Sequence, residues 1–167
     1  MPSVGSLVDG YLLIVSKRHV NSMANLSENE KKEYEFLINK YRNLFKKIYN
    51  KFPIIFEHGS PILNSNMKAS SVIHAHSHIV NHNFIDENSI IKKLKFKEMD
   101  NLKFLSKDKN YIMYINSENK YYITNDFKPI SQILRKIITK DLGYENMFDW
   151  KEYKFLENIY STIKKVK

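Results

Sequence analysis

The chain has 167 residues, of which 43% are hydrophobic and 27% are charged, and its formal net charge is +9. This length and composition indicate a soluble, globular, single-domain protein and exclude a disordered chain. The absence of cysteine excludes disulfides and thiolate metal sites, and no apolar run reaches the ~18 residues that cross a bilayer.

The positive charge and the N-terminal sequence bear on partners and location. Lysines are spread along the whole chain, and a basic surface suits either nucleic acid or small phosphorylated substrates. The first ten residues, MPSVGSLVDG, lack the charged and apolar regions of a signal peptide. We therefore expect a cytoplasmic protein with no membrane partner.

The first elements of the chain are a strand and a long helix. Residues 10–16 form a short apolar run that predicts a buried strand, and His19 follows its end. Ser27 and Glu30 have the spacing of a capping box, in which each side chain bonds the other residue's backbone N–H group. Apolar side chains then recur at spacings of three and four, which predicts an amphipathic helix over 28–50.

Two further strands follow the helix, and the second carries three histidines. Residues 54–57 and 71–80 are rich in β-branched side chains, and a loop sequence joins them, so we expect an antiparallel pair. His74, His76 and His78 recur at every second position of the latter segment. Because side chains alternate between the two faces of a strand, this spacing brings the three imidazoles to one face.

The second half of the chain predicts mostly helices around one hairpin. Strands are expected over 111–115 and 120–124, joined by Asn116 to Asn119. Gly143 is expected to cap the C-terminus of a helix that Pro129 begins. The expected helices cover residues 86–94, 96–105, 129–142 and 150–164.

Three histidines on one strand suit two kinds of chemistry. Neutral imidazole binds zinc, copper or iron, but each strand residue rises ~3.3 Å, so the outer two histidines are ~13 Å apart and one ion could hardly bind all three. Alternatively, His76 attacks phosphorus as a nucleophile, and its two neighbours orient it and stabilise the phosphate. The second interpretation uses all three rings.

The segment His74-Ala75-His76-Ser77-His78-Ile79-Val80 resembles the His-x-His-x-His-x-x signature of the histidine-triad (HIT) superfamily. The segments GYLLIVSKRHVNSMANLSENE and IIFEHGS resemble the elements that precede this signature, so the resemblance covers about residues 4–80. It implies an α+β, HIT-like fold with an antiparallel sheet of about five strands, a long helix, and pairing into a homodimer.

The remainder of the chain resembles the C-terminal elements of an FEHG-type branch of the superfamily. This likeness is carried by the segments PISQILRKII and FDWKEY. We therefore expect a HIT-like catalytic core over residues 1–83 and a mainly helical C-terminal extension over 84–167, packed together as one unit.

The resemblance also implies an activity and residue roles. It implies a nucleotide hydrolase that acts at the α-phosphorus of a nucleoside phosphoramidate, a dinucleoside polyphosphate or another nucleotide conjugate, with no metal or other cofactor. By position in the signature, His76 is the nucleophile that forms a nucleotidyl-histidine intermediate, His74 orients it, and His78 bonds phosphoryl oxygens or the leaving group. His19 and Ser71 are expected to bind the phosphate. A histidine at position 78 favours hydrolases over transferases.

Two further substrate-binding candidates have alternatives. Glu57 stands where many small members of the superfamily carry asparagine, and it either binds ribose hydroxyls or pairs with His19, His58 or Lys68. Arg135 either contacts a phosphate through its planar guanidinium group or is solvated on a helix surface. The alternative function is a nucleotide- or nucleic-acid-binding protein that processes nucleic-acid ends.

Overall fold

A single antiparallel sheet organises the part of the chain that the computed structural model describes, which is residues 1–60, 74–83, 85–127 and 130–167. Within these residues the sheet has six strands in the order β1-β3-β2-β5-β6-β4. The strands are β1 (Tyr11–Val15), β2 (Ile54–Gly59), β3 (His76–Val80), β4 (Lys97–Met99), β5 (Tyr111–Ile115) and β6 (Tyr121–Thr124).

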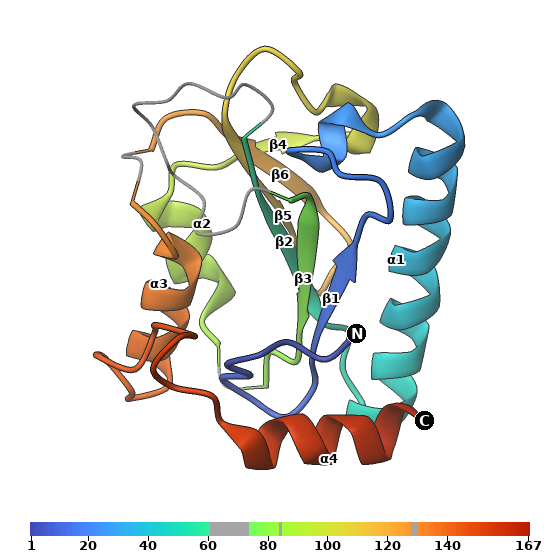
Figure 1. Cartoon of the computed structure of the whole chain (residues 1–167). Coiled ribbons are helices and arrows are strands. Elements are labelled where there is room, and N and C mark those ends of the chain that lie inside the picture. The colour runs from blue at the N-terminus through green and yellow to red at the C-terminus, as the bar shows by residue number, and fades with distance from the viewer. Residues whose placement is uncertain (61–73, 84, 128–129) are drawn as a thin grey trace.

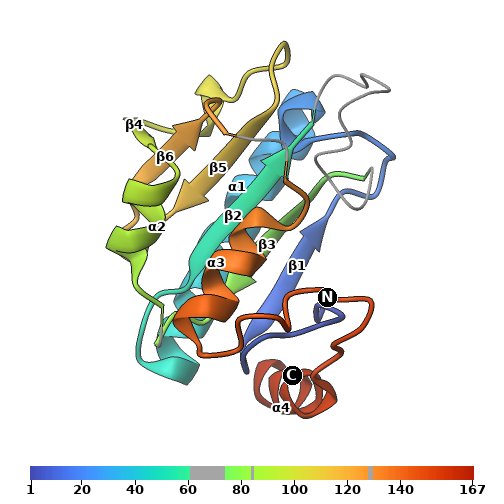
Figure 2. The same cartoon turned by 90° about the vertical axis from the view of Figure 1, so that its left-hand side faces the viewer.

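Helices cover both faces of the sheet and one of its ends. The α-helices are α1 (Glu28–Tyr49), α2 (Glu87–Lys93), α3 (Ile133–Asp141) and α4 (Leu156–Val166), and short 3-10 helices cover Met23–Asn25 and Leu102–Phe104. Helix α1 lies on one face, α2 and α3 lie on the other, and α4 crosses one end (Figure 1, Figure 2). The sheet is therefore the middle layer of three.

The alternation of strand side chains divides the hydrophobic core in two. Tyr34, Ile38 and Phe45 of α1 pack against one face of the sheet. Ile90 of α2 and Leu134 of α3 pack against the other face. Apolar side chains on alternate strand positions therefore meet different helices, as the period of two requires.

Helix α1 confirms the helix predicted over 28–50. The Ser27 side chain accepts from the Glu30 N–H group at 3.4 Å, and the Glu30 carboxylate accepts from the Ser27 N–H group at 2.7 Å. These two bonds are the predicted capping box, and they satisfy N–H groups that the first helical turn leaves unpaired. The helix ends where Asn50 adopts a left-handed conformation with φ of 57°.

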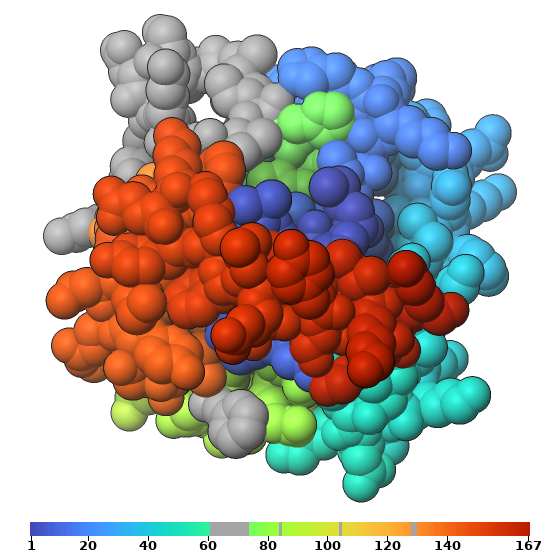
Figure 3. Space-filling model, turned by 60° about the horizontal axis from the view of Figure 1, so that its bottom comes forward, coloured from blue at the N-terminus to red at the C-terminus, as the bar shows by residue number. Residues whose placement is uncertain are grey.

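The N-terminal residues and α4 close the edge of the sheet at β1. The Leu13 N–H group donates to the Met1 carbonyl at 2.7 Å, which extends the ladder past β1. The Gly10 N–H group donates to the Thr162 hydroxyl at 2.8 Å, and Lys165 forms an ion pair with Asp9. Figure 3 shows the red and orange C-terminal segments running across the blue N-terminal residues.

The structure confirms the strands predicted over 10–16, 54–57, 111–115 and 120–124, the short helix over 86–94, and the antiparallel pairing of β2 with β3. The strand predicted over 71–80 begins only at His76 in the described residues, so His74 precedes the strand and only His76 and His78 share one of its faces. The helix predicted over 96–105 is wrong. Strand β4 occupies part of that segment because it pairs with β6, with Lys97 opposite Ile123. Lys95, whose φ is 50°, ends the preceding helix.

The C-terminal half contributes more strand than predicted. Strands β4, β5 and β6 all come from it, and β5 pairs directly with β2, so the sheet runs across residue 83 and has six strands instead of about five. The described residues of the C-terminal extension are mainly helical, as expected, but they also supply three strands of the sheet. The last helix begins at Leu156 instead of Trp150, because Phe155 adopts a left-handed conformation with φ of 51°. Helix α3 begins at Ile133, and Pro129 lies outside the described residues.

Candidate functional site

A cavity of about 170 Å³ lies between the sheet and the C-terminal segment. Strands β1, β2 and β3 contribute Leu13, Phe56, His58, His76 and His78 to its lining. The C-terminal segment contributes Gln132, Ile133, Leu134, Arg135 and Trp150, and the N-terminal residues Met1, Ser3 and Val4 complete it. The cavity therefore brings two histidines of the triad next to residues far along the chain.

Strand pairing explains why the aromatic side chains of the cavity meet. Phe56 of β2 lies opposite His78 of β3, and the two rings stack with centroids 4.5 Å apart. The rings of His76 and His78 lie edge to face at 4.9 Å. His58 follows Phe56 by two residues and so shares its face of the sheet. As this alternation requires, His58 lines the same cavity as Phe56.

His76 is held as a neutral ring with a defined tautomer. Its Nδ1 atom lies 2.7 Å from the carbonyl oxygen of His74. Because a carbonyl oxygen only accepts, Nδ1 carries the hydrogen and Nε2 has the unshared electron pair of the neutral ring. Burial lowers the pKa of His76 below its ordinary value, so the neutral form dominates at neutral pH. The unshared electron pair on Nε2 is therefore available to accept a hydrogen bond or to attack an electrophile.

His78 is also held neutral, with the opposite tautomer. Its Nδ1 atom lies 2.9 Å from the hydroxyl of Tyr11, which is fully buried, and Arg135 Nη1 donates to the same hydroxyl over 3.5 Å. The buried hydroxyl hydrogen needs an acceptor, and Nδ1 provides one, so the proton of His78 resides on Nε2. Burial holds the pKa of His78 well below its ordinary value, and the charge of Arg135 lowers it further.

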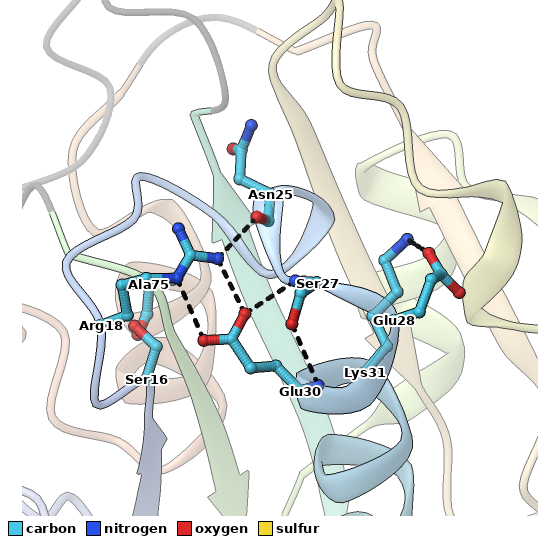
Figure 4. Close-up of polar contacts among 8 residues, drawn as sticks. All are labelled: Ser16, Arg18, Asn25, Ser27, Glu28, Glu30, Lys31 and Ala75. Atoms are coloured by element: carbon cyan, nitrogen blue, oxygen red, sulfur yellow. Dashed lines mark hydrogen bonds and ion pairs between the residues drawn. The ribbon is translucent and has the colours of Figure 1, made fainter.

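His74 and His19 lie together beside β3. The Nε2 atom of His74 lies 2.7 Å from the Ser16 carbonyl oxygen, and its ring meets the ring of His19 edge to face at 5.1 Å. Arg18 fixes the turn before His19 because its guanidinium group donates to the Glu30 carboxylate at 2.7 Å (Figure 4). The structure therefore groups His19 with His74, whose carbonyl oxygen in turn fixes His76.

Glu57 lies on the sheet face that α1 covers, away from the cavity. Its side chain is 1% exposed and accepts from the Met23 N–H group and the Tyr111 hydroxyl, each at 2.7 Å. Burial raises the pKa of Glu57 to about 7. Glu57 thus joins β2 and β5 to the 3-10 helix Met23–Asn25, and the structure does not bring it to the triad. Ser71 and Lys68 lie outside the described residues.

Arg135 is buried at 5% exposure, so the solvated alternative for it is wrong. Its Nε atom donates to the Phe148 carbonyl at 2.8 Å. Its Nη2 atom is buried and has no hydrogen-bond partner in the part of the chain that is described. The same holds for Oε1 of Gln132 and Nε2 of His58, which also line the cavity. Unpartnered buried polar atoms are uncommon, and here three of them belong to the lining of one cavity.

Sequence reasoning missed Tyr11 and His58 as members of the site. His58 carried a signal, since it stands two residues after Phe56 on a strand that was predicted to pair with the triad strand. Tyr11 carried none, because its position depends on the pairing of β1 with β3, in which Leu13 lies opposite His78. Trp150 was expected within a helix, but it stands in the segment between α3 and α4.

Comparison of the sequence with models of protein families and with curated proteins finds no match. Among the described residues, no group of three or more histidine, aspartate or glutamate side chains is arranged to hold a metal ion. No helix in the same residues is long and apolar enough to cross a membrane.

Proposed function

We propose that the protein is a nucleotide hydrolase of the histidine-triad type, which cleaves a nucleoside phosphoramidate or a dinucleoside polyphosphate at the α-phosphorus. The proposal rests above all on the 2.7 Å contact between His76 Nδ1 and the His74 carbonyl oxygen. That contact leaves the electron pair of a neutral imidazole on Nε2. It also stabilises the positive charge that the ring acquires when Nε2 bonds to phosphorus.

The reaction has two displacements at phosphorus. In the first, the Nε2–P bond forms while the bond between phosphorus and the leaving group breaks, and the leaving group departs with the bonding electrons. A leaving amine takes a proton from the solvent, whereas a leaving phosphate needs none. In the second, water attacks phosphorus, the Nε2–P bond breaks, the electron pair returns to His76, and a proton of the water is released.

Three other residues support these steps. The Nε2–H group of His78, which is set by the contact of Nδ1 with Tyr11, donates to a phosphoryl oxygen and stabilises the charge that grows there. His74 fixes the ring of His76 through its backbone carbonyl. His19, whose ring contacts the ring of His74, is the further residue that we propose to bind phosphate.

Trapping the intermediate tests the proposal. The protein is incubated with adenosine 5′-phosphoramidate or diadenosine tetraphosphate, and turnover is measured. Samples quenched in alkaline denaturant, which preserves an N–P bond, are examined by mass spectrometry for an adenylyl adduct on His76. We expect turnover and an adduct in the native protein and neither in the His76→Ala variant.

His82→Ala is the matched control. This histidine lies outside the cavity lining, with Nδ1 3.3 Å from the Glu87 carboxylate, and its loss should leave turnover unchanged. Equal turnover by the native protein and His76→Ala would refute the nucleophile assignment.

A further inference from the structure

The charge balance of the cavity indicates which leaving group it receives. The guanidinium group of Arg135 is buried and permanently charged, and within the described residues it forms no ion pair. The carboxylate of Asp149 accepts from the Lys151 N–H group and from Gln132. The bond from Lys151 is the main cause that lowers the pKa of Asp149, and the charge of Arg135 adds the smallest contribution. A buried cation without an anionic partner is costly, so an anion from outside would stabilise it.

The histidines of the cavity cannot act as acids at neutral pH. Burial lowers the pKa of His58 to about 4, and it holds those of His76 and His78 below their ordinary values. Each ring is therefore neutral and has no proton to give to a departing amine without becoming an anion. No aspartate or glutamate is among the described residues that line the cavity.

Geometry sets Arg135 apart from the phosphorus that His76 attacks. The Tyr11 hydroxyl stands between Arg135 Nη1 and His78 Nδ1, with contacts of 3.5 Å and 2.9 Å. The side chain of Tyr11 thus separates the Arg135 guanidinium group from the His78 ring, which holds the phosphoryl oxygen in the proposed mechanism. Gln132 and Trp150 line the cavity on the same C-terminal side. A group that leaves phosphorus toward this side meets the positive charge of Arg135, and no carboxyl group or protonated histidine is among the described residues that line the cavity.

We propose that Arg135 forms a subsite for a leaving group that departs as an oxyanion, so that the preferred substrates are anhydrides at the α-phosphorus and not amidates. This inference rests on the proposed function and narrows its substrate class. The Nε2–P bond forms as the P–O bond breaks, the electron pair goes to the leaving oxygen, and no proton is required. The oxyanion is a phosphate from a phosphoanhydride or a carboxylate from an acyl adenylate.

The test compares three adenosine substrates with the same nucleotidyl group: diadenosine tetraphosphate, acetyl adenylate and adenosine 5′-phosphoramidate. The kcat/KM of each is measured for the native protein and for Arg135→Gln, Arg135→Lys and Lys136→Gln. We expect Arg135→Gln to lower kcat/KM at least about thirtyfold for one or both anhydrides, and less than about threefold for the amidate. The anhydride with the larger loss identifies the oxyanion.

Arg135→Lys keeps a charge but not the planar fork, so it should show a smaller loss in the same pattern, and it carries the test if Arg135→Gln fails to fold. Lys136→Gln removes a neighbouring charge whose Nζ atom lies over the Phe148 ring, and it should behave like the native protein. Equal losses for all three substrates would overturn the subsite, since they would show that Arg135 acts only through Tyr11 or through folding.

A binding measurement separates the subsite from the proposed function. If the native protein turns over none of the three substrates, the proposed function fails. Titration calorimetry with inorganic phosphate then tests separately whether Arg135 forms an anion-binding subsite. Phosphate binding that weakens at least about tenfold in Arg135→Gln, but not in His76→Ala, supports the subsite. Equal binding by the native protein and Arg135→Gln overturns it.

Discussion

The hydroxyl of Tyr11 lies 2.9 Å from Nδ1 of His78 and receives a hydrogen bond from Arg135 over 3.5 Å. The two contacts form a relay that starts at a permanent cation and ends at a triad histidine. Because the guanidinium group only donates, the relay has a fixed direction. The relay makes Tyr11 a positioning residue for His78, although Tyr11 belongs to the buried and mostly apolar strand β1.

Replacement of Tyr11 by phenylalanine should allow His78 to adopt both neutral tautomers instead of one. We expect kcat to fall about tenfold, which corresponds to about 1.4 kcal/mol and is typical of one lost hydrogen bond, while KM changes little. Nitrogen-15 chemical shifts of His78 should show Nδ1 partly protonated in the Tyr11→Phe variant.

Tyr34→Phe is the control for this variant. It removes a buried hydroxyl that lies 2.6 Å from Ser77 on the other face of β3, so it should affect stability but not the tautomer. An unchanged His78 spectrum in Tyr11→Phe would contradict the relay.

The acid limb of the activity profile should lie below pH 6.5. Protonation of His76 removes the electron pair that attacks phosphorus in the proposed mechanism, and burial lowers the pKa of His76. The kcat/KM for diadenosine tetraphosphate should therefore stay level as the pH falls from 8 through about 6.5 and decline only at lower pH. A decline centred at or above pH 6.5 would contradict the assignment.

Folding must be followed across the same pH range. His58 has its pKa lowered to about 4 in the folded state, so it contributes stability that is present above about pH 6.5 and lost as the pH falls toward 4. Circular dichroism at each pH separates loss of the nucleophile from loss of the fold.

The parts of the fold that could be predicted from sequence are those with local causes. The capping box of Ser27 and Glu30 and the apolar period after it predict α1 because both act within a few residues. Residues 96–105 were misassigned because the hydrogen-bonding partner that makes Lys97–Met99 a strand is β6, which lies more than twenty residues further along the chain. Strand pairing of this kind leaves little local signal.

The same distinction applies to the candidate site. The spacing of His76 and His78 is a property of one strand and could be read directly from the sequence. Glu57 was expected in the site because it stands where many small members of the resembled superfamily carry asparagine. The alternation of β2 places Glu57 on the opposite face, where it bonds Met23 and Tyr111. Arg135 reaches the cavity only because α3 packs over the sheet.

Glu57→Gln should change the pH dependence of stability. The pKa of Glu57 is raised to about 7 in the folded state from an unfolded value of 4.5, so the folded state binds the proton more tightly. Its favourable contribution is complete below about pH 4.5 and is lost as the pH rises through about 7. Glutamine cannot ionise, so the variant should gain stability relative to the native protein over this range, by about 3 kcal/mol in total.

Urea unfolding at pH values from 4.5 to 8.5 measures this difference. Glu33→Gln, on the exposed side of α1, controls for the loss of a carboxylate as such. A difference between Glu57→Gln and the native protein that stays constant over the range would show that Glu57 is ionised throughout.

Two glycine substitutions test whether the C-terminal cover of the cavity matters to turnover. Gly5 and Gly143 have nearly the same backbone conformation, with φ of 75° and 76°. An added Cβ at Gly5 would lie 2.7 Å from the Cβ atom of Trp150 and 3.1 Å from Arg135 Nη2, whereas at Gly143 it would meet no described atom within 4 Å. Both substitutions strain the backbone to a similar degree, but only the added Cβ atom of Gly5→Ala contacts residues that line the cavity.

Gly143→Ala should therefore lower the free energy of unfolding by about 1 to 2 kcal/mol, the usual cost of a side chain in the left-handed region, and leave kcat/KM unchanged. Gly5→Ala should lose more stability and also lower kcat/KM, because Trp150 and Arg135 must move. Thermal unfolding and steady-state kinetics on both variants provide the comparison. If Gly5→Ala matched Gly143→Ala in both measurements, the packing of Gly5 against Trp150 would have no part in shaping the cavity.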